Sequence, residues 1–190
     1  MSDKMRPYPT VIKDGFFDDP DQIRQFALAQ ELLDVKAHNA RYGARETWPG
    51  LRSAALGSLN SAFEAGVINH LLANILRLPP SRWKANSSFQ LTRAADGDSW
   101  IHRDDQRFDI AGLIYLTPNP PGNSGTAFYN GSPESGFAET DRVANRFNRV
   151  LLFDSQAWHK SCVYFGSSPA DARLTLPFFI ELEPEDTAAP

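Results

Sequence analysis

The stretch Ser99-Trp100-Ile101-His102-Arg103-Asp104 places an imidazole and a carboxylate two residues apart. We expect an extended strand here, and because side chains in a strand alternate between its faces, His102 and Asp104 would point the same way. A third donor lies far along the chain, at His159 in Trp158-His159-Lys160. Two histidines and one carboxylate form the facial triad that binds non-heme Fe(II) and leaves coordination positions open. The sequence therefore predicts a metal site made of His102, Asp104 and His159.

A second group of polar side chains follows the triad, at Arg173-Leu174-Thr175. A strand would again turn Arg173 and Thr175 to one face. The guanidinium group of an arginine binds a carboxylate through two parallel hydrogen bonds, and a threonine hydroxyl can add a third. The pair therefore predicts a site for a carboxylate that lies on one face of a late strand.

In the order His102-x-Asp104, His159 and Arg173-x-Thr175, these motifs resemble those of the Fe(II)- and 2-oxoglutarate-dependent dioxygenases, and especially of their prolyl-4-hydroxylase-like branch. The resemblance covers roughly residues 85–183. It implies that the triad binds Fe(II), and that Arg173 and Thr175 hold the distal carboxylate of 2-oxoglutarate. It also implies an oxidoreductase that uses O2, releases succinate and CO2, and hydroxylates a small molecule, an amino acid or a peptidyl residue.

The chain departs from the family pattern at one contact to 2-oxoglutarate. Many members of the prolyl-hydroxylase-like branch carry a tyrosine shortly before the glycine that precedes the first histidine. Here Ala94-Ala95 stand before Gly97. Tyr115 or Gln90, on neighbouring predicted strands, would have to supply that contact, and we name Tyr115 as the candidate cofactor-binding residue.

Two other functions are compatible with these residues. A zinc hydrolase also uses two histidines and one carboxylate, although the chain has no His-Glu-x-x-His helix that would supply a general base. A jelly-roll module could instead retain the pocket for metal binding or sensing without turnover.

Asp105 is an alternative ligand to Asp104, but strand parity turns it away from His102. Arg93, Arg103 and Arg107 could recognise an anionic substrate or lie solvated at the barrel rim.

Composition and charge limit the classes of function. The 190 residues are 42% hydrophobic and carry a net charge of −4 without a block of basic residues, so no nucleic-acid partner is expected. There is no apolar run long enough to cross a bilayer, and residues 1–10 lack the apolar core of a secretory signal. We therefore expect a cytoplasmic protein without a membrane partner. Its single cysteine, Cys162, excludes an intrachain disulfide.

The signals for secondary structure change along the chain. Helices are expected before residue 79: one from Asp19-Pro20 toward Leu33, and one long helix, or two broken near Gly66, over 53–78. Residues 36–52 are expected to form a loop that could line a pocket. Strands are expected over the ranges 9–17, 83–92, 100–104, 110–116, 125–129, 149–153, 157–163 and 173–182. Residues 130–147 are predicted as a turn-rich excursion over the site, and 149–153 is predicted to pair with 157–163.

Many short strands preceded by helices predict an α+β fold, a double-stranded β-helix (jelly roll) with N-terminal supporting helices. The dioxygenase resemblance implies the same architecture. We expect a single domain over residues 1–190, with mainly helical support in 1–80, the jelly-roll core in 81–183 and a frayed tail in 184–190.

Overall fold

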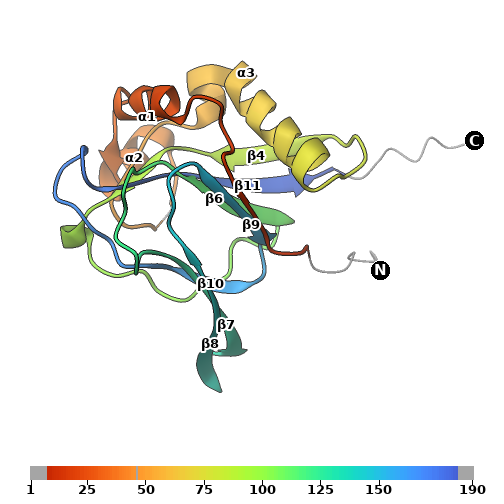
Figure 1. The fold of residues 1–190 in the computed structure, drawn as a ribbon, viewed down its shortest axis with the longest axis vertical. Helices are drawn as coiled ribbons and strands as arrows, with labels where there is room; N and C mark the ends of the chain where they lie inside the picture. The colour runs from red at the N-terminus through yellow and green to blue at the C-terminus, as the bar shows by residue number, and fades with distance from the viewer. Residues whose placement is uncertain (1–7, 46, 184–190) are drawn as a thin grey trace, which may run out of the picture.

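The structure is a computed structural model that describes residues 8–45 and 47–183. Two antiparallel sheets form its framework, and helices cover the outer face of the larger sheet (Figure 1). The larger sheet has the order β1 (Val11–Asp14), β9 (Arg149–Asp154), β6 (Ile110–Tyr115), β11 (Arg173–Leu182), β5 (Gln90–Thr92), β3 (Leu51–Arg52) and β2 (Leu33–Asp34), and β4 (Trp83–Ser87) also pairs with β11. The smaller sheet has the order β10 (Trp158–Cys162), β7 (Gly125–Ser132) and β8 (Gly136–Ala144).

Successive side chains of β11 point alternately to the two faces of the larger sheet, one packed against the helices and the other facing the smaller sheet. Leu174, Leu176 and Phe178 are fully buried in a cluster with residues of the helices. The odd-numbered residues of the same strand point to the opposite face. The register of β11 thus places Arg173 and Thr175 on the face that looks toward the smaller sheet.

Helices α1 (Pro20–Leu28) and α3 (Leu56–Asn69) cover the outer face, and α3 continues into a π-helix (His70–Ile75). The Asp19 carboxylate accepts a hydrogen bond from Gln22 N at 3.0 Å, and Pro20 occupies the first helical position. An acceptor at the cap and a proline without an N–H satisfy the start of a helix, as predicted. The helical residues buried against the sheet are Ala27, Leu56, Val67, Ile68, Leu71 and Leu72.

A second core lies between the two sheets. Tyr115 and Leu151 from the larger sheet contact Phe128 and Val143 from the smaller one, together with Ala111 and Phe153. The two sheets are therefore joined by apolar packing, and a site between them can draw side chains from both.

Two expectations for the helical part were wrong. The predicted loop over 36–52 contains helix α2 (Val35–Tyr42), which begins where Asp34 Oδ1 accepts from Ala37 N at 2.8 Å and ends at Gly43, with φ of 65°. None of its residues is buried, so it has no apolar periodicity to reveal it. Helix α1 ends at Leu28 and does not continue toward Leu33, which lies in β2. Of the two alternatives for 53–78, the structure has the long helix without a break at Gly66, interrupted only at Asn60, where φ is −160°.

Three expectations for the strands were also wrong. The single strand over 83–92 is divided into β4 and β5, which both pair with β11. Part of the predicted excursion over 130–147 forms β8, in a hairpin with β7. Strands β9 and β10 do not pair with each other: β9 lies between β1 and β6, and β10 pairs with β7. The turn between β9 and β10 therefore carries the chain from one sheet to the other.

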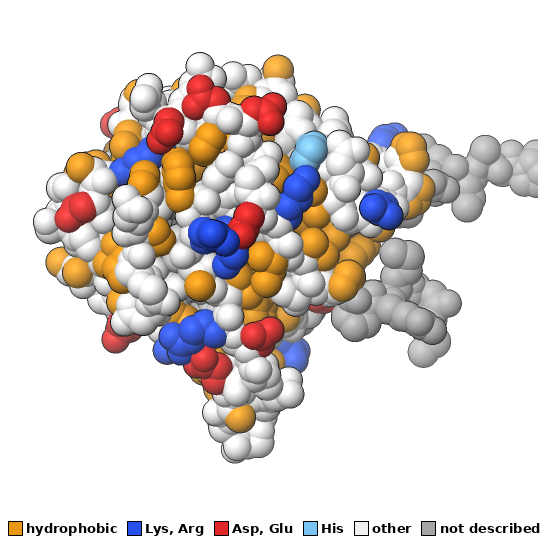
Figure 2. All heavy atoms as spheres, in the orientation of Figure 1, with side chains coloured by type: hydrophobic (Ala, Val, Ile, Leu, Met, Phe, Trp, Pro, Cys, Tyr) orange, Lys and Arg blue, Asp and Glu red, His pale blue; other side chains and the backbone are white. Residues whose placement is uncertain are grey.

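The boundary near residue 80 does not separate helices from sheet, since β1, β2 and β3 of the N-terminal part belong to the larger sheet. The predicted tail, 184–190, lies outside the described residues. Across the part of the chain that the structure describes, no helix has the length and apolar character to cross a bilayer. Figure 2 shows acidic, basic and apolar side chains interspersed on one face of the molecule.

Candidate metal centre

Main-chain hydrogen bonds, rather than a continuous strand, hold the segment that carries His102. His102 N donates to His159 O at 3.0 Å and His159 N donates to His102 O at 3.0 Å, which forms an isolated antiparallel bridge. Asp104 N donates to Ser155 O at 3.0 Å. The strand predicted over 100–104 is thus reduced to one bridge, but this bridge brings the two histidines side by side.

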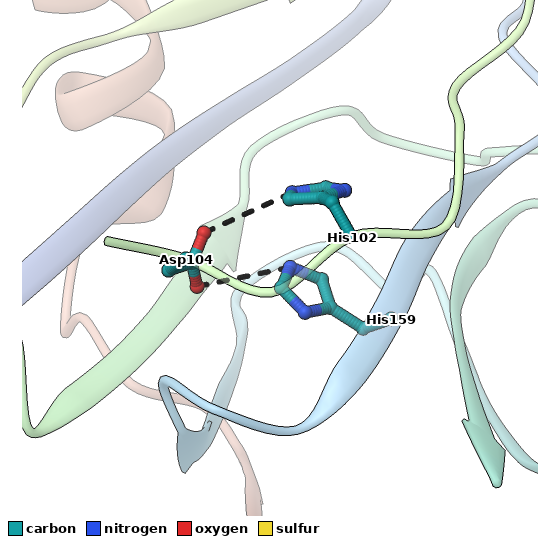
Figure 3. Close-up of side chains that lie close together, drawn as sticks. All are labelled: His102, Asp104 and His159. Carbon is teal, nitrogen blue, oxygen red and sulfur yellow. Dashed lines mark ion pairs between the residues drawn. The ribbon is translucent and has the colours of Figure 1, made fainter. Parts of the chain in front are cut away.

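The three predicted ligands face one another (Figure 3). His102 Nε2 lies 3.8 Å from Asp104 Oδ1, and His159 Nε2 lies 3.8 Å from Asp104 Oδ2. The candidate ligand atoms all lie within 4.8 Å of one another. Distances of 3.8 Å are too long for hydrogen bonds, so the three side chains do not satisfy one another directly, and a separation of a few ångströms leaves room for an ion bonded to all three donors. The arrangement therefore suits three ligands of a single metal ion.

Both imidazole rings are fixed by their second nitrogen. His102 Nδ1 lies 3.0 Å from Trp100 O, and His159 Nδ1 lies 2.9 Å from Ala157 O. A carbonyl oxygen only accepts hydrogen bonds, so each Nδ1 carries the hydrogen and donates it. Each neutral ring then presents the lone pair of Nε2 toward Asp104, as a metal ligand requires.

Burial disturbs the protonation of the whole triad. The side chains of Asp104 and His159 are only 8% and 9% exposed. Burial raises the pKa of Asp104 to about 6, against the opposing charges of His102 and Arg52. Burial also lowers the pKa of His159 to about 4. The pKa of His102 is lowered mainly by burial and secondly by the charge of the neighbouring His159. Neutral imidazoles are favoured, and the nearby positive charge does not offset the burial of the carboxylate.

An unpartnered oxygen tests whether a cation fits this donor set. Asp104 Oδ2 is buried and has no hydrogen-bond partner among the residues described. A buried carboxylate oxygen without a partner is costly, and a divalent cation between the carboxylate and the two Nε2 atoms would satisfy it. The residues present therefore fit a metal with mixed nitrogen and oxygen ligands.

The triad lines a cavity of about 510 Å3, and Arg173 and Thr175 line the same cavity. Both side chains are buried, and Arg173 is only 3% exposed. Arg173 Nε is buried and makes no hydrogen bond within the described residues. Five of the predicted site residues thus converge on one cavity, with an arginine whose donor is unused.

Tyr115 lies behind the cavity wall and is not one of the residues that line it. It is fully buried, and its hydroxyl group lies 2.8 Å from Thr126 Oγ1. Thr126 lines the cavity, so Tyr115 is connected to the cavity wall through that hydroxyl. Gln90 also lines the cavity, but its amide donates to Pro49 O at 2.9 Å and accepts from Arg52 Nη2 at 3.3 Å. A contact from Tyr115 to 2-oxoglutarate stays a prediction.

Thr126 and Tyr164 are among the residues of the cavity wall that the sequence analysis did not name. Thr126 shares a face of β7 with buried Phe128, and this alternation was the only available signal. Tyr164 follows β10, and the Arg173 guanidinium carbon lies 6.0 Å from its ring centroid; no sequence pattern indicated it. The predicted loop over 36–52 contributes Trp48 and Arg52 to the wall.

Comparison with solved structures gives the fold class: the chain has the fold of the 2OG-Fe(II) oxygenases. HygX from Streptomyces hygroscopicus, with nickel, 2-oxoglutarate and hygromycin B bound, has a TM-score of 0.66 and 14% identity, over 90% of this chain and 82% of that chain. A 2OG-Fe(II) oxygenase family protein from Burkholderia pseudomallei has a TM-score of 0.60 and 10% identity, over 90% and 84%. AviO1 from Streptomyces viridochromogenes has a TM-score of 0.53 and 16% identity, over 98% and 95%.

No protein-family model matches the chain, and no curated protein matches it. At identities of 10% to 16% the likeness to HygX and the other structures concerns the fold. The fold that the motifs predicted is thus the one that these structures share. Assignment to the prolyl-4-hydroxylase-like branch stays a prediction.

Proposed function

We propose that the chain is an Fe(II)- and 2-oxoglutarate-dependent oxygenase that hydroxylates a small molecule, an amino acid or a peptidyl residue. Its two antiparallel sheets would form the double-stranded β-helix of that class. One observation carries the proposal: His102, Asp104 and His159 meet in a cavity that also contains the buried, unpartnered donor of Arg173. The fold shared with 2OG-Fe(II) oxygenases supports it.

The triad would hold the iron. Neutral Nε2 atoms of His102 and His159 and the carboxylate of Asp104 match the preference of Fe(II) for two imidazoles and one carboxylate. The hydrogen bonds from Nδ1 to Trp100 O and Ala157 O hold both rings in position before the metal binds. Bound iron would supply the activation of O2 that accompanies oxidative decarboxylation of 2-oxoglutarate to succinate and CO2.

Arg173 and Thr175 would hold the distal carboxylate of 2-oxoglutarate. Both side chains are nearly inaccessible to solvent, so a carboxylate bound there would lose its water and gain a charge-assisted hydrogen bond. The co-substrate would then be oriented with its opposite end toward the metal. The HygX structure, which shares the fold, contains both nickel and 2-oxoglutarate.

The zinc hydrolase alternative requires a general base beside the metal. Asp105 is the remaining carboxylate in the described cavity wall, but it is 59% exposed and pairs with Arg107 at 3.5 Å. A carboxylate that is exposed and already paired with an arginine is poorly placed to act as that base, and the oxygenase therefore remains the better match. A metal-binding or sensing module would use the same residues and differ only in lacking turnover.

Anaerobic addition of Fe(II) and 2-oxoglutarate tests the proposal. We expect a weak visible charge-transfer band in the native chain, no band in His102→Ala, and succinate formation once air is admitted. His70→Ala is a matched control, because His70 lies in the π-helix beside Asn74 and outside the cavity. An unchanged band in His102→Ala would refute the ligand assignment. Tight zinc without succinate would favour a hydrolase, and iron and 2-oxoglutarate binding without turnover would favour a sensing module.

A further inference from the structure

The cavity has an excess of positive charge in a chain whose net charge is −4. Among the described residues, its wall contains no lysine or glutamate, and its carboxylates are Asp104 and Asp105. The arginines that line it are Arg45, Arg52, Arg103, Arg107 and Arg173. Charges of one sign that line a concave surface raise the local concentration of the opposite ion.

These arginines lie at different depths. Arg173 is buried, and under the proposed function the distal carboxylate of 2-oxoglutarate balances its charge. Arg45, Arg103 and Arg107 are exposed, so they lie at the mouth of the cavity. Arg107 is paired with Asp105, whereas neither Arg45 nor Arg103 has a carboxylate partner in the described part of the chain. The mouth thus retains positive charge that neither the metal nor the co-substrate requires.

Aromatic rings hold the guanidinium groups of this region in place. The Arg103 guanidinium carbon lies 4.5 Å from the ring centroid of Trp158, and that of Arg107 lies 4.5 Å from the centroid of Phe108. Stacking of this kind leaves the N–H donors at the edge of the guanidinium plane available to an anion. It also restricts the side chain in advance, which lowers the entropy lost when a ligand binds.

The cavity has room for a second small molecule. At about 30 Å3 for each non-hydrogen atom, as for liquid water, 2-oxoglutarate would fill at most about 300 Å3. The cavity measures about 510 Å3. Because Arg173 is buried and Arg103 and Arg107 are exposed, a molecule bound beside the co-substrate would lie on the side of these two exposed arginines.

We propose that the mouth of the cavity binds the oxyanion group, a carboxylate or a phosphate, of a small molecule through Arg103 and Arg107. This inference rests on the proposed function, under which that small molecule is the primary substrate. The oxyanion would lie between the two guanidinium groups, with the oxidised part of the molecule directed toward the triad. Both residues act as binding and specificity groups.

Matched pairs of compounds test the charge requirement. The panel contains carboxylic acids with their methyl esters, phosphate monoesters with the corresponding alcohols, and primary amines. Calorimetric titration into anaerobic protein with Fe(II) and saturating 2-oxoglutarate reads binding, and succinate release in air reads turnover. We expect acids or phosphates to bind and to stimulate succinate release, and their uncharged partners to do neither. Their binding should weaken as salt is raised, a measurement that requires no variant.

Variants then test the arginines. Arg103→Gln and Arg107→Gln should each weaken binding of the responding anion by about tenfold, as for a lost charge-assisted hydrogen bond. Asp105→Asn should strengthen it several-fold, because Arg107 loses its competing partner. Arg41→Gln is the matched control: it removes one charge from α2, where Arg41 pairs with Glu31 outside the cavity. The Arg41→Gln variant should bind the responding anion with the affinity of the native chain.

Several results would overturn the inference. These are binding of esters, alcohols or amines as tightly as the anions, native affinity in the Arg103 and Arg107 variants, or no anion bound by protein that binds 2-oxoglutarate. Anion binding that depends on the arginines, without any succinate, would support the oxyanion site and contradict the proposed turnover. Succinate release that is stimulated only by uncharged compounds would support the proposed turnover and contradict the oxyanion site. The two proposals can thus fail separately.

Discussion

Two neighbouring aspartates on the metal-binding segment have opposite surroundings. The Asp104 side chain is 8% exposed and faces both histidines, whereas the Asp105 side chain is 59% exposed and pairs with Arg107. Strand parity predicted this difference from the sequence. The segment forms only one bridge, at His102, but its local extension is sufficient to keep His102 and Asp104 on one side.

The first prediction concerns metal affinity. Asp104→Asn should weaken Fe(II) binding by about 100-fold or more, because the site loses its only charged ligand and keeps two neutral donors. Asp105→Asn, which also removes one negative charge, should bind Fe(II) within about threefold of the native chain. Anaerobic calorimetry on both variants, with circular dichroism to check folding, makes the comparison. Equal losses in the two variants would contradict the ligand assignment.

The second prediction concerns Arg173. Arg173→Ala should weaken 2-oxoglutarate binding by about 100-fold, since truncation of one partner of a buried charge pair costs about 2–5 kcal/mol. Arg173→Lys should recover part of the loss, because it restores the charge without the two-pronged geometry. Titration of 2-oxoglutarate in the presence of a divalent metal measures both. Native affinity in Arg173→Ala would exclude this residue as the anchor.

The sequence was sufficient to predict which residues meet at the site where their chemistry is specific and their spacing follows strand parity. His102, Asp104, His159, Arg173 and Thr175 line one cavity as predicted. The place of Tyr115 could not be predicted, because its hydroxyl meets Thr126 on a strand of the other sheet. A contact of this kind depends on how two sheets pack, and no local pattern records it.

At the scale of the elements, β6 depends on a residue without a side chain. A Cβ atom at Gly112 would lie 2.3 Å from Leu151 O and 2.6 Å from the nearest atom of the Phe178 ring. These neighbours belong to β9 and β11, which flank β6. Gly112 therefore allows the close approach of the three central strands.

The third prediction follows from this approach. Gly112→Ala should lower the free energy of unfolding by about 1–3 kcal/mol, because the methyl group has no space between backbone and ring. Gly66→Ala, in α3 with nothing within 4 Å of the added Cβ, should instead raise it by about 0.5–1 kcal/mol through helix propensity. Urea unfolding of both variants reads the difference. A stabilised Gly112→Ala would contradict the described packing of β6.

Strand β1 is held to β9 partly by charge. Asp14 accepts hydrogen bonds from Arg149 Nε at 2.6 Å and Nη2 at 3.0 Å, and from Arg146 Nη1 at 2.8 Å. The hydrogen bond from Arg149 is the main cause that lowers the pKa of Asp14. A group whose pKa is lowered by folding stabilises the fold above its unfolded pKa, and this contribution is lost as the pH falls through the folded pKa.

The fourth prediction concerns the pH dependence of stability. Between pH 6 and pH 3, the native chain should lose more unfolding free energy than Asp14→Asn, which has no carboxyl group to protonate. Because Asp14 is partly exposed, the difference should be at most about 1 kcal/mol. Parallel urea titrations at each pH measure it. Identical losses would show that the interaction contributes nothing to stability.

Local patterns revealed the elements with a buried face and missed those without one. Strands β6, β9 and β11 and helices α1 and α3 bury apolar residues, and the sequence predicted each of them. Helix α2 buries none of its residues, and β8 buries only Val143. The predicted pairing of β9 with β10 failed because adjacency in the chain favours a hairpin, whereas β6 and β1 already occupy both edges of β9.

For the molecule as a whole, the β7–β8 hairpin projects beyond the packed sheets (Figure 1). Its outer residues, 130–139, are mostly exposed, in contrast to the buried strands β6 and β11. Tyr129 and Phe137 on the hairpin lie 6.5 Å apart between ring centroids, and Phe137 packs against Trp158 at 4.9 Å. Few apolar contacts therefore hold the outer part of the hairpin.

The fifth prediction concerns local stability. Amide hydrogens of residues 130–138 should exchange at least about 100-fold faster than those of β6 and β11, because opening the hairpin exposes little buried surface. Hydrogen exchange followed by mass spectrometry compares the segments within one experiment. Equal protection of the hairpin and the central strands would indicate a further contact that covers it.

The mutual bridge between His102 and His159 has a consequence for the release of a bound ion. Each histidine's main chain is the hydrogen-bonding partner of the other, so separation of the two segments would displace both imidazoles together. Dissociation by that route would be all-or-none, without a state that keeps one ring and loses the other. The lifetime of the bridge would then set an upper limit on how fast an ion leaves.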